Sequence, residues 1–489
     1  MQTKKAIGNL LNRYRAVLKK CHLLNTFGTL ALASALMAAG AGSALAASWG
    51  WVNKSAEGPY TAWTSINKDT TIVNGKVEGN TLNSTAEKDV IGFVYFAGFE
   101  KDSGTAVTIT DSSFKNNTIS AKYGVSAGGI MNKGMTIDLN NVEFSGNKIS
   151  SGGYSNGGAI YADAAKNDDV GVKEGILNFN VTKDMIYSGN TVEGKADTWT
   201  DTYGAVAAPV SGGFLYLDRN STANFNISDG ATLTIGAEDA SGHMDSIASS
   251  LAIDEASKVK SSTLVKKGGG TLTVNSQLND FYGHVAVQEG TMNVTKDWDV
   301  KNDISVSGGT LNLANASLVK VPDIEYIGTD GKTKKTLTSD KTPAGRINIS
   351  GGTVNADSLT VGEKSSVDMT GGELNMKNSL TLNGAMTLSC GAAATVAMPN
   401  KGGVSAGSGE SLLALGQPVT LGNSAKLHVG TVSGDATAAF GSDSILVVND
   451  GVSSQNAMIN GSGNLSVGDG AQLYVTDAKA NTKSSLPKV

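Results

Sequence analysis

Apolar and polar residues alternate with a period of two along many short stretches of this chain. Clear examples are TLTV at 271–274, HVAV at 284–287 and SLTLNGAMTL at 379–388. Such alternation predicts short strands with one buried face, and the Gly and Asn residues between them predict tight turns. The chain has only 7 Pro, as expected where backbone N–H groups serve β-ladders. We therefore expect an all-β fold.

A six-residue pattern recurs in the first half of the chain. It reads VEGNTL at 77–82, FKNNTI at 114–119, FSGNKI at 144–149 and YSGNTV at 187–192, so successive copies begin 37, 30 and 43 residues apart. A glycine-led apolar run follows each copy, for example GGAIYA from Gly157. Repetition at this period indicates a repeat architecture. The expected structural residues of these repeats are Phe114, Asn117, Phe144, Asn147, Gly157, Gly158, Asn190 and Gly212.

A second pattern replaces the first in the C-terminal half. It reads EGTMN at 289–293, GGTLN at 308–312, GGTVN at 351–355 and GGELN at 371–375. Its second glycines lie 19, 43 and 20 residues apart, and the long middle gap contains the polar stretch 328–346, which we expect to be a loop or hairpin. The expected structural residues here are Gly290, Asn293, Gly309, Asn312, Gly352, Asn355, Gly372 and Asn375.

Short strands at a period of about 20–30 residues predict a parallel β-helix, in which each repeat is one coil that stacks on its neighbours. A β-sandwich array would repeat at a much longer interval. We expect the Asn of each pattern to stack at a corner of the coil, and Gly to occupy corners that leave no room for a Cβ. Both patterns supply the same strand, Gly and Asn, so we expect a single elongated rod with β-helix at 47–240 and at 241–480, and a polar tail at 481–489.

The N-terminus has the features of a secretory signal peptide. Residues 1–26 contain six Lys and Arg and no acid, and the uncharged run FGTLALASALMAAGAGSALAA follows at 27–47. A basic segment, an apolar segment and a small-residue cleavage site define such signals. We therefore interpret 1–46 as a long signal peptide that is cleaved after Ala46 or Ala47.

Cleavage would make the chain more acidic. It leaves 33 Lys and Arg against 44 Asp and Glu, a net charge of −11, and a single cysteine. One cysteine cannot form an internal disulfide framework. Basic residues are not clustered with aromatic ones, so we expect no nucleic-acid partner.

The repeats and the signal together resemble the passenger region of a type V autotransporter. The pairing of FKNN and FSGN with GGAI resembles the repeats of chlamydial-type polymorphic membrane proteins, and LVKKGGGTLTVNSQLNDFYGHVAVQEGTMNV at 264–294 resembles the autotransporter-associated β-strand repeat. The two resemblances cover most of residues 77 to 375. They imply a right-handed parallel β-helix displayed at the surface of a Gram-negative bacterium, commonly as an adhesin, with export machinery and an outer-membrane translocator as partners.

The last part of the chain departs from that family. Autotransporters end in a membrane barrel of alternating strands with aromatic girdles, but residues 376–489 show no such run and contain only Phe440 and Tyr474 as aromatics. We therefore expect a truncated gene, a separately encoded translocator or a released protein.

An enzyme is the first alternative to a binding protein. β-Helical lyases and glycosidases use paired carboxylates, or a carboxylate with Arg or Lys, and the candidates here are Asp163, Asp168, Asp169 and Asp218, with Arg219 and Arg346. The string GSDS at 441–444 does not match a serine-protease turn, and His243, His284 and His428 stand singly. No calcium-loop motif is present. We expect no catalytic residue, metal or cofactor.

The binding hypothesis places recognition on loops, because loops on a rigid scaffold tend to carry it. The insertions at 193–211 and 328–346 are the candidates, and Trp199 is the candidate binding residue in the first. The expected ligand is a glycan or protein on a host or environmental surface. A purely structural stalk is the second alternative.

Overall fold

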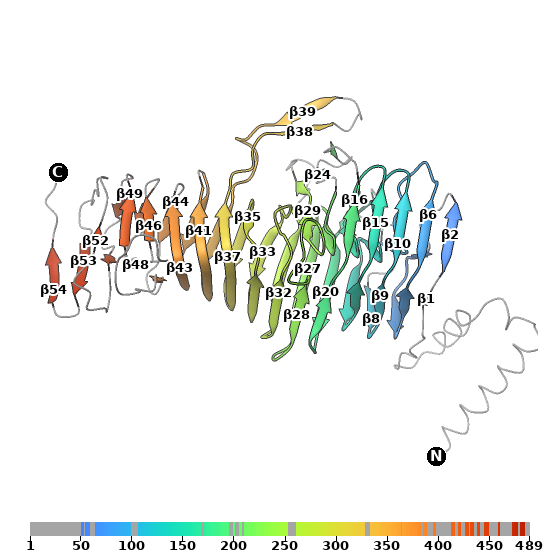
Figure 1. Ribbon diagram of the computed structural model, residues 1–489, viewed down its shortest axis with the longest axis horizontal. Coiled ribbons are helices and arrows are strands. Elements are labelled where there is room, and N and C mark those ends of the chain that lie inside the picture. Colours follow the sequence, from blue (N-terminus) through green and yellow to red (C-terminus); the bar gives the residue numbers. More distant parts are fainter. Residues whose placement is uncertain are drawn as a thin grey trace, which may run out of the picture.

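The structure is a computed structural model that describes residues 50–52, 54–58, 64–98, 106–167, 171–194, 199–200, 205–207, 210–252, 261–327, 333–362, 364–382 and 385–388, with short strands between 395 and 484. The described residues form strands and turns, and none of them belongs to a helix that could cross a bilayer. The strands stack into one elongated rod (Figure 1). The predicted all-β parallel β-helix is therefore confirmed.

One parallel sheet, here called the spine sheet, contains 13 strands and runs through both repeat types. Its neighbouring strands pair parallel from β4 to β50, including the step from β27 to β31 where the sequence pattern changes. Its strands are β4 (Thr70–Val73), β8 (Ala106–Thr110), β13 (Thr136–Asn140), β20 (Gly175–Val181), β27 (Ser221–Ile227), β31 (Thr263–Lys267), β33 (His284–Val287), β36 (Asp303–Val306), β40 (Arg346–Ile349), β42 (Ser366–Met369), β44 (Ala385–Leu388), β47 (Val419–Leu421) and β50 (Ala438–Phe440).

Coils of the N-terminal half add up to four shorter strands to a spine strand. These strands form four parallel sheets. The first contains β1 (Gly50–Val52), β5 (Lys76–Glu78), β9 (Ser113–Lys115) and β14 (Glu143–Ser145); the second β2 (Ser55–Gly58), β6 (Thr81–Ser84), β10 (Thr118–Ala121), β15 (Lys148–Ser151) and β22 (Thr191–Glu193); the third β11 (Val125–Ser126), β16 (Ser155–Asn156) and β25 (Val210–Ser211); the fourth β3 (Thr64–Ile66), β7 (Val94–Ala97), β12 (Ile130–Lys133), β17 (Ile160–Asp163), β26 (Leu215–Leu217) and β29 (Ile247–Ser249). A small hairpin of β18 (Ala165–Asn167) and β19 (Gly171–Lys173) leaves one coil.

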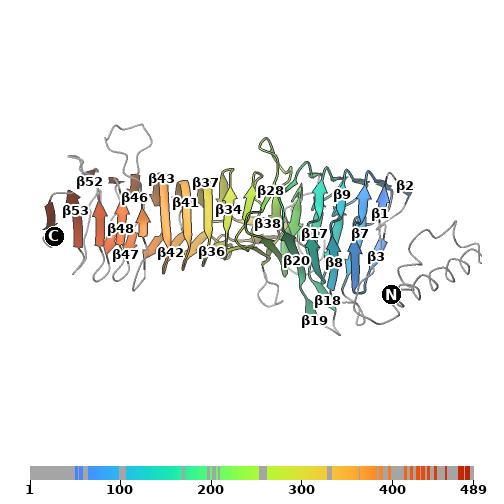
Figure 2. The ribbon, with the colours of Figure 1, turned by 90° about the horizontal axis from the view of Figure 1, so that it is seen from below.

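Coils of the C-terminal half are shorter and use a second long sheet, here called the flank sheet. From β32 onward, flank and spine strands alternate along the chain (Figure 2). The flank strands are β21 (Met185–Tyr187), β28 (Thr232–Ile235), β32 (Thr271–Val274), β34 (Thr291–Val294), β35 (Trp298–Val300), β37 (Thr310–Leu318), β41 (Thr353–Val361), β43 (Glu373–Leu382), β45 (Thr395–Ala397), β46 (Leu412–Leu415), β48 (Lys426–Val429), β49 (Thr431–Gly434), β51 (Ile445–Val448), β52 (Met458–Ile459), β53 (Gln472–Asp477) and β54 (Ala480–Ser484).

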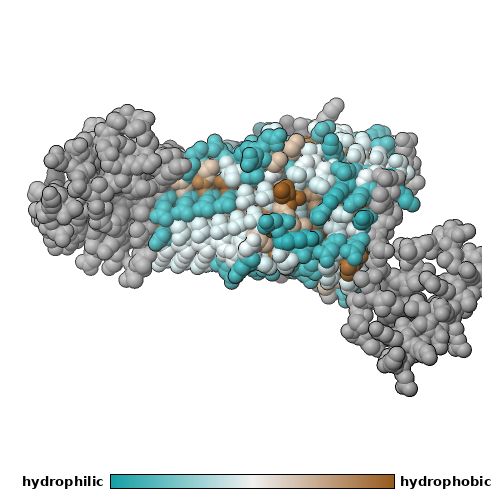
Figure 3. Space-filling view, turned by 60° about the horizontal axis from the view of Figure 1, so that its bottom comes forward, coloured by the Kyte–Doolittle hydropathy of each residue, from teal (hydrophilic) through white to brown (hydrophobic). Residues whose placement is uncertain are grey.

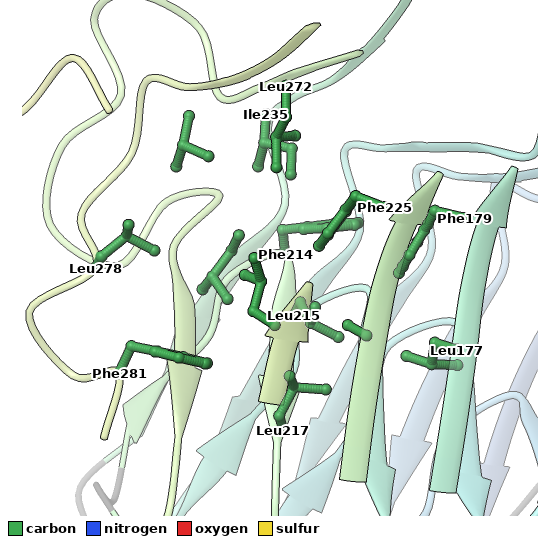
Figure 4. Close-up of a cluster of buried hydrophobic side chains, with 14 of the residues drawn as sticks. Leu177, Phe179, Phe214, Leu215, Leu217, Phe225, Ile235, Leu272, Leu278 and Phe281 are labelled. Atoms are coloured by element: carbon green, nitrogen blue, oxygen red, sulfur yellow. The ribbon is translucent and has the colours of Figure 1, made fainter. Parts of the chain in front are cut away.

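The core lies inside the coils and consists of like residues stacked in register. Phe114 and Phe144 are opposite each other in β9 and β14, with ring centroids 5.3 Å apart. Phe179 and Phe225 stack at 4.6 Å on neighbouring spine strands, and Figure 4 shows them side by side. Alternate residues are buried in strands such as β8 and β32, which is the pattern that the period-two alternation predicts, whereas β17 and β26 are buried at every position.

Glycines occupy corners where the backbones of successive coils approach closely. A Cβ on Gly158 would lie 2.1 Å from the carbonyl oxygen of Gly213, and one on Gly128 would lie 2.1 Å from that of Gly158. Gly157 and Gly212 have φ of +74° and +72°, a region that glycine adopts at little cost. The second pattern forms a similar column, Gly290, Gly309, Gly352 and Gly372, whose members all have positive φ.

The Asn residues of the first pattern form a buried ladder at a corner. Their side-chain amides donate from coil to coil: Asn80 to Asn117 at 2.9 Å, Asn117 to Asn147 at 2.8 Å, Asn147 to Asn190 at 2.9 Å, and Asn190 to Asp245 at 3.0 Å. The four Asn side chains are fully buried. Each of Asn117, Asn147 and Asn190 also donates to a backbone carbonyl of the preceding coil. The buried backbone carbonyls at this corner are thus hydrogen-bonded by the Asn side chains.

The Asn residues of the second pattern lie elsewhere, and the expected corner position is wrong for them. Asn293, Asn312, Asn355 and Asn375 lie within flank strands, on their outer face, where they are partly exposed. They also form a ladder, with amide bonds of 2.7, 2.7 and 3.0 Å. The reason is local: in Thr-x-Asn the middle residue is buried, so the period of two directs Asn outward.

Lys266 lies inside the core where one repeat type gives way to the other. It is opposite Phe225 on one neighbouring strand and Val287 on the other, and it is fully buried. Its Nζ donates to the carbonyl oxygens of Lys267 at 2.8 Å, Gly268 at 2.6 Å and Glu289 at 3.1 Å. Burial lowers the pKa of Lys266 to about 8. Lys266 is the first lysine of the segment KKGGG at 266–270, and its ammonium group caps the turn that these glycines form.

Candidate functional site

The first insertion, 193–211, meets a hairpin in one sheet beside the rod, and that hairpin begins at Ile324, before the predicted second insertion 328–346. This lateral sheet has the strand order β30-β24-β23-β38-β39. The first insertion supplies β23 (Trp199–Thr200) and β24 (Ala205–Ala207), the joint between the repeat types supplies β30 (Leu251–Ala252), and a hairpin supplies β38 (Ile324–Ile327) and β39 (Lys334–Leu337). The hairpin stands off the rod close to β24 (Figure 1). Segments more than 100 residues apart in the chain therefore build one surface.

Trp199 lies at the centre of this sheet. Its backbone is opposite Ala207 in the antiparallel pair β23–β24 and opposite Ile327 in the parallel pair β23–β38. Residues 195–198 and 201–204 lie outside the described residues. Trp199 is thus the residue at which the two insertions join, a position that the sequence does not reveal.

A small apolar cluster attaches the lateral sheet to the rod. Leu251 of β30 and Leu337 of β39 are buried together, with Tyr282 and Ile324 packed against them. At the base of the hairpin, the hydroxyl of Thr342 donates to Val321 O, and the ammonium of Lys320 donates to Thr342 O. The backbone N–H of Val321 donates to Pro343 O at 3.1 Å. The hairpin is therefore held at its base and along one face, while the edge of β39 has no partner strand among the described residues.

A second constellation gathers the carboxylates that the enzyme hypothesis names. Asp163 is the last residue of β17, and Asp218 directly follows β26, the equivalent strand of the next coil. Arg219 bridges them, with Nη2 3.3 Å from Asp163 Oδ2 and Nη1 3.6 Å from Asp218 Oδ2. Lys133 of the preceding coil lies 3.3 Å from Asp163 Oδ2, and the hydroxyl of Tyr161 donates to Asp218 Oδ2 at 2.5 Å.

Burial decides what this cluster can do. The side chains of Asp163, Asp218 and Arg219 are only 3%, 8% and 9% exposed. Burial and the charge of Asp218 raise the pKa of Asp163 to about 6, although Arg219 and Lys133 oppose the rise. Asp163 Oδ1 has no hydrogen-bond partner. A polysaccharide cannot reach carboxylates that are sealed in this way, so the geometry favours an internal ion cluster over a catalytic pair.

The sequence contains a signal for this cluster that its repeats conceal. The runs GGAIYAD and GGFLYLD both end in Tyr, one residue and Asp. Once the two runs are placed in register, Tyr161 lies on Tyr216, with rings stacked at 5.2 Å, and the aspartates become neighbours. The insertion between the repeats obscures that register.

The other candidates do not form a site. His284 Nε2 is 2.8 Å from Ser305 Oγ, and His243 Nδ1 is 3.6 Å from Asp280 Oδ2. Asp168 and Asp169 lie outside the described residues, as do residues 1–49 with the proposed cleavage position; for His428 only the strand is described. Residues 481–484 of the expected polar tail belong instead to β54, which pairs with β53, and residues 485–489 lie outside the described residues. Within the described part of the chain, no group of three or more His, Cys, Asp or Glu residues could hold a metal ion.

Comparison with known proteins gives one informative match. A stretch of 169 residues, 35% of this chain, is 28% identical to the probable autotransporter YfaL of Escherichia coli (strain K12), and it covers 12% of the length of that protein. No protein family model matches the chain. No solved structure matches it either. This weak similarity supports an autotransporter passenger, and it agrees with the β-helical architecture.

Proposed function

We propose that this protein is an exported, passenger-like binding rod, an adhesin without enzymatic activity, that acts at the surface of a Gram-negative bacterium. Three features support the proposal: the basic and apolar N-terminus, the parallel β-helix, and the similarity to a probable autotransporter. Its partners would be a glycan or protein on a host or environmental surface, together with export machinery and an outer-membrane translocator.

The observation that carries the binding role is the lateral sheet. Two insertions from distant coils, which a stalk would not need, pair through Trp199 and Ile327 and are held against the rod by buried leucines. A β-helix is rigid because each coil is bonded to the next. A sheet anchored to such a scaffold presents its outer residues in a defined arrangement, which lowers the ordering cost of binding.

The test compares binding with stability in the chain that follows the signal peptide. We expect Trp199→Ser to weaken binding to host cells or to a glycan array at least tenfold, with an unchanged melting temperature. Tyr123→Ser is the control for the loss of an exposed aromatic side chain, because Tyr123 is 42% exposed and lies in the turn between β10 and β11, outside the strands of the lateral sheet. Wild-type protein that binds no cell or glycan would favour the stalk, and undiminished binding of Trp199→Ser would place the site elsewhere.

The enzymatic alternative, a polysaccharide lyase or glycosidase, has a separate test. The paired carboxylates Asp163 and Asp218 are its best candidates. We expect no release of reducing ends or unsaturated products from polygalacturonate. Release that is abolished by Asp218→Asn would establish the enzyme and refute the adhesin.

A further inference from the structure

The outer face of the flank sheet carries two straight rows of uncharged polar side chains. The first row is Thr232, Thr271, Thr291, Thr310 and Thr353, which are paired strand to strand. The second row is Thr234, Thr273, Asn293, Asn312, Asn355 and Asn375. All these side chains are partly exposed, and the residue between each pair is buried. Figure 3 shows aligned rows of hydrophilic side chains along the rod.

The rows are ordered before any ligand arrives. Asn293 donates to Thr273 at 3.2 Å, and Asn312, Asn355 and Asn375 each donate to the preceding Asn at 2.7–3.0 Å. Each of these bonds uses one of the two amide N–H groups and one lone pair of the accepting oxygen. The remaining donors and acceptors are therefore available at a constant interval on side chains whose rotamers are already restricted, so binding would cost little further entropy.

The surroundings leave the threonine row open. The corner beside it is a column of glycines, in which a Cβ on Gly309 would lie 2.5 Å from Gly290 O and one on Gly352 would lie 2.4 Å from Gly309 O. The corner is thus bare backbone. Carboxylates bound the threonine row at both ends: Asp184 Oδ1 accepts from the backbone N–H of Thr232 at 2.9 Å, and Glu373 follows Thr353 in register. A neutral strip therefore crosses five strands, a length of about 20 Å at the usual strand spacing.

We propose that these rows bind a neutral, extended, β-linked polysaccharide that lies along the rod axis. Such a glycan presents hydroxyl groups at a constant interval along its axis, as the rows present theirs at the strand spacing of about 4.8 Å. An extended peptide rises about 3.3 Å per residue and would lose register with the coils. An anionic glycan would find no cation in the rows to pair with. This surface is separate from the lateral sheet, so the inference does not depend on the proposed adhesin site.

A second copy of the chain is the other polymer with a matching repeat. Stable protein interfaces have an apolar centre and aromatic or arginine anchors. The two rows contain only hydroxyl and amide side chains. They are therefore suited to many weak hydrogen bonds with a hydroxyl-rich ligand, in which affinity grows with the number of coils spanned.

The experiment measures the binding of cellohexaose and cellobiose by calorimetry. We expect cellohexaose to bind at least tenfold more tightly than cellobiose, and Thr310→Glu to weaken cellohexaose binding at least tenfold. Glutamate is tolerated in this row because Glu373 occupies it. Thr136→Glu is the control, since Thr136 is a partly exposed residue of the spine sheet. A further variant, Asn312→Thr, reproduces the residue at Thr273 and should weaken binding several-fold without loss of the fold.

Three results would overturn the proposal. The first is wild-type protein that does not bind cellohexaose. The second is equal loss of binding in the Thr310→Glu and Thr136→Glu proteins, or loss in neither. The third is concentration-dependent dimerisation that Thr310→Glu abolishes while cellohexaose has no effect on it, which would assign the face to a second copy.

Discussion

Replacing Asn147 by Leu removes the centre of the buried Asn ladder. In the wild type, Asn147 Nδ2 donates to Phe114 O at 2.8 Å and to Asn190 Oδ1 at 2.9 Å. Its Oδ1 accepts from Asn117 Nδ2 at 2.8 Å and from the Asn117 backbone N–H at 3.4 Å. Leucine fills a similar volume but makes none of these four bonds.

The size of the effect follows from which partners are left unpaired. Asn117 Nδ2 keeps its bond to Val77 O, and Asn190 Oδ1 keeps the bond from the backbone N–H of residue 147. The backbone N–H of Asn117 loses its acceptor, and Phe114 O loses a donor. Each buried group left without a partner costs about 1–3 kcal/mol. We expect a loss of about 2–6 kcal/mol in the free energy of opening these coils.

Hydrogen exchange is the appropriate assay, because a solenoid opens locally and need not unfold in one step. The amide of Asn117 should exchange much faster in the Asn147→Leu protein, and the amides of coils beyond residue 300 should be unchanged. Asn312→Leu is the matched control. Asn312 is partly exposed and its neighbours in the ladder face solvent, so we expect a change within about 0.5 kcal/mol.

The comparison between the two ladders makes the reasoning refutable. Equal destabilisation by Asn147→Leu and Asn312→Leu would show that burial does not distinguish them. Unchanged exchange at Asn117 in the Asn147→Leu protein would show that water replaces the amide at the corner.

Three further changes test the interior. Asp163 has its pKa raised from 3.8 to about 6, so its ionised form destabilises the fold at neutral pH. Stability should rise by about 1.4 kcal/mol as pH falls from 7.5 to 5, and Asp163→Asn should remove that rise in urea titrations. Gly158→Ala should cost about 1–3 kcal/mol, because its Cβ would meet a carbonyl at 2.1 Å, whereas Gly153→Ala, at 3.2 Å, should cost less in the same thermal melts. Lys266→Ala should destabilise more than Lys266→Met, because alanine adds a cavity to the loss of the ammonium; equal denaturation midpoints would contradict this.

The rod is predictable from the sequence because its causes are local and repeated. Alternation determines which side chains are buried, and the glycine corners recur at the coil period. The position of the second Asn ladder is also encoded locally, although the expectation of a corner missed it: the residue between Thr310 and Asn312 is Leu311, which is buried, so Asn312 must face outward. In the first pattern Asn147 follows Gly146, whose φ is +66°, and this turn directs the amide inward.

The lateral sheet and the ion cluster are not predictable in the same way. Trp199 and Ile327 pair across many intervening coils, and no short pattern contains that contact. The sequence shows Asp163 and Asp218 as neighbours only when their two repeats are aligned with the intervening insertion left out. Both depend on how insertions fold back on the scaffold, which is a property of the assembled rod and not of any one repeat.

Two buried charged residues lie at the joint between the two repeat types. The buried Asn ladder ends at Asp245, which accepts three bonds, from Gly189 N, Asn190 N and Asn190 Nδ2, and therefore needs no further donor from a following coil. Shortly afterwards Lys266 supplies donors to three carbonyls at the turn where the glycine column begins. The Asp245 carboxylate, which can only accept hydrogen bonds, ends the Asn ladder, and the Lys266 ammonium, which can only donate them, stabilises the first glycine turn of the second repeat type. Asp245 and Lys266, two of the charged residues inside this rod, are thus placed where the periodic pattern changes, because a coil there lacks the neighbour that would otherwise complete its hydrogen bonds.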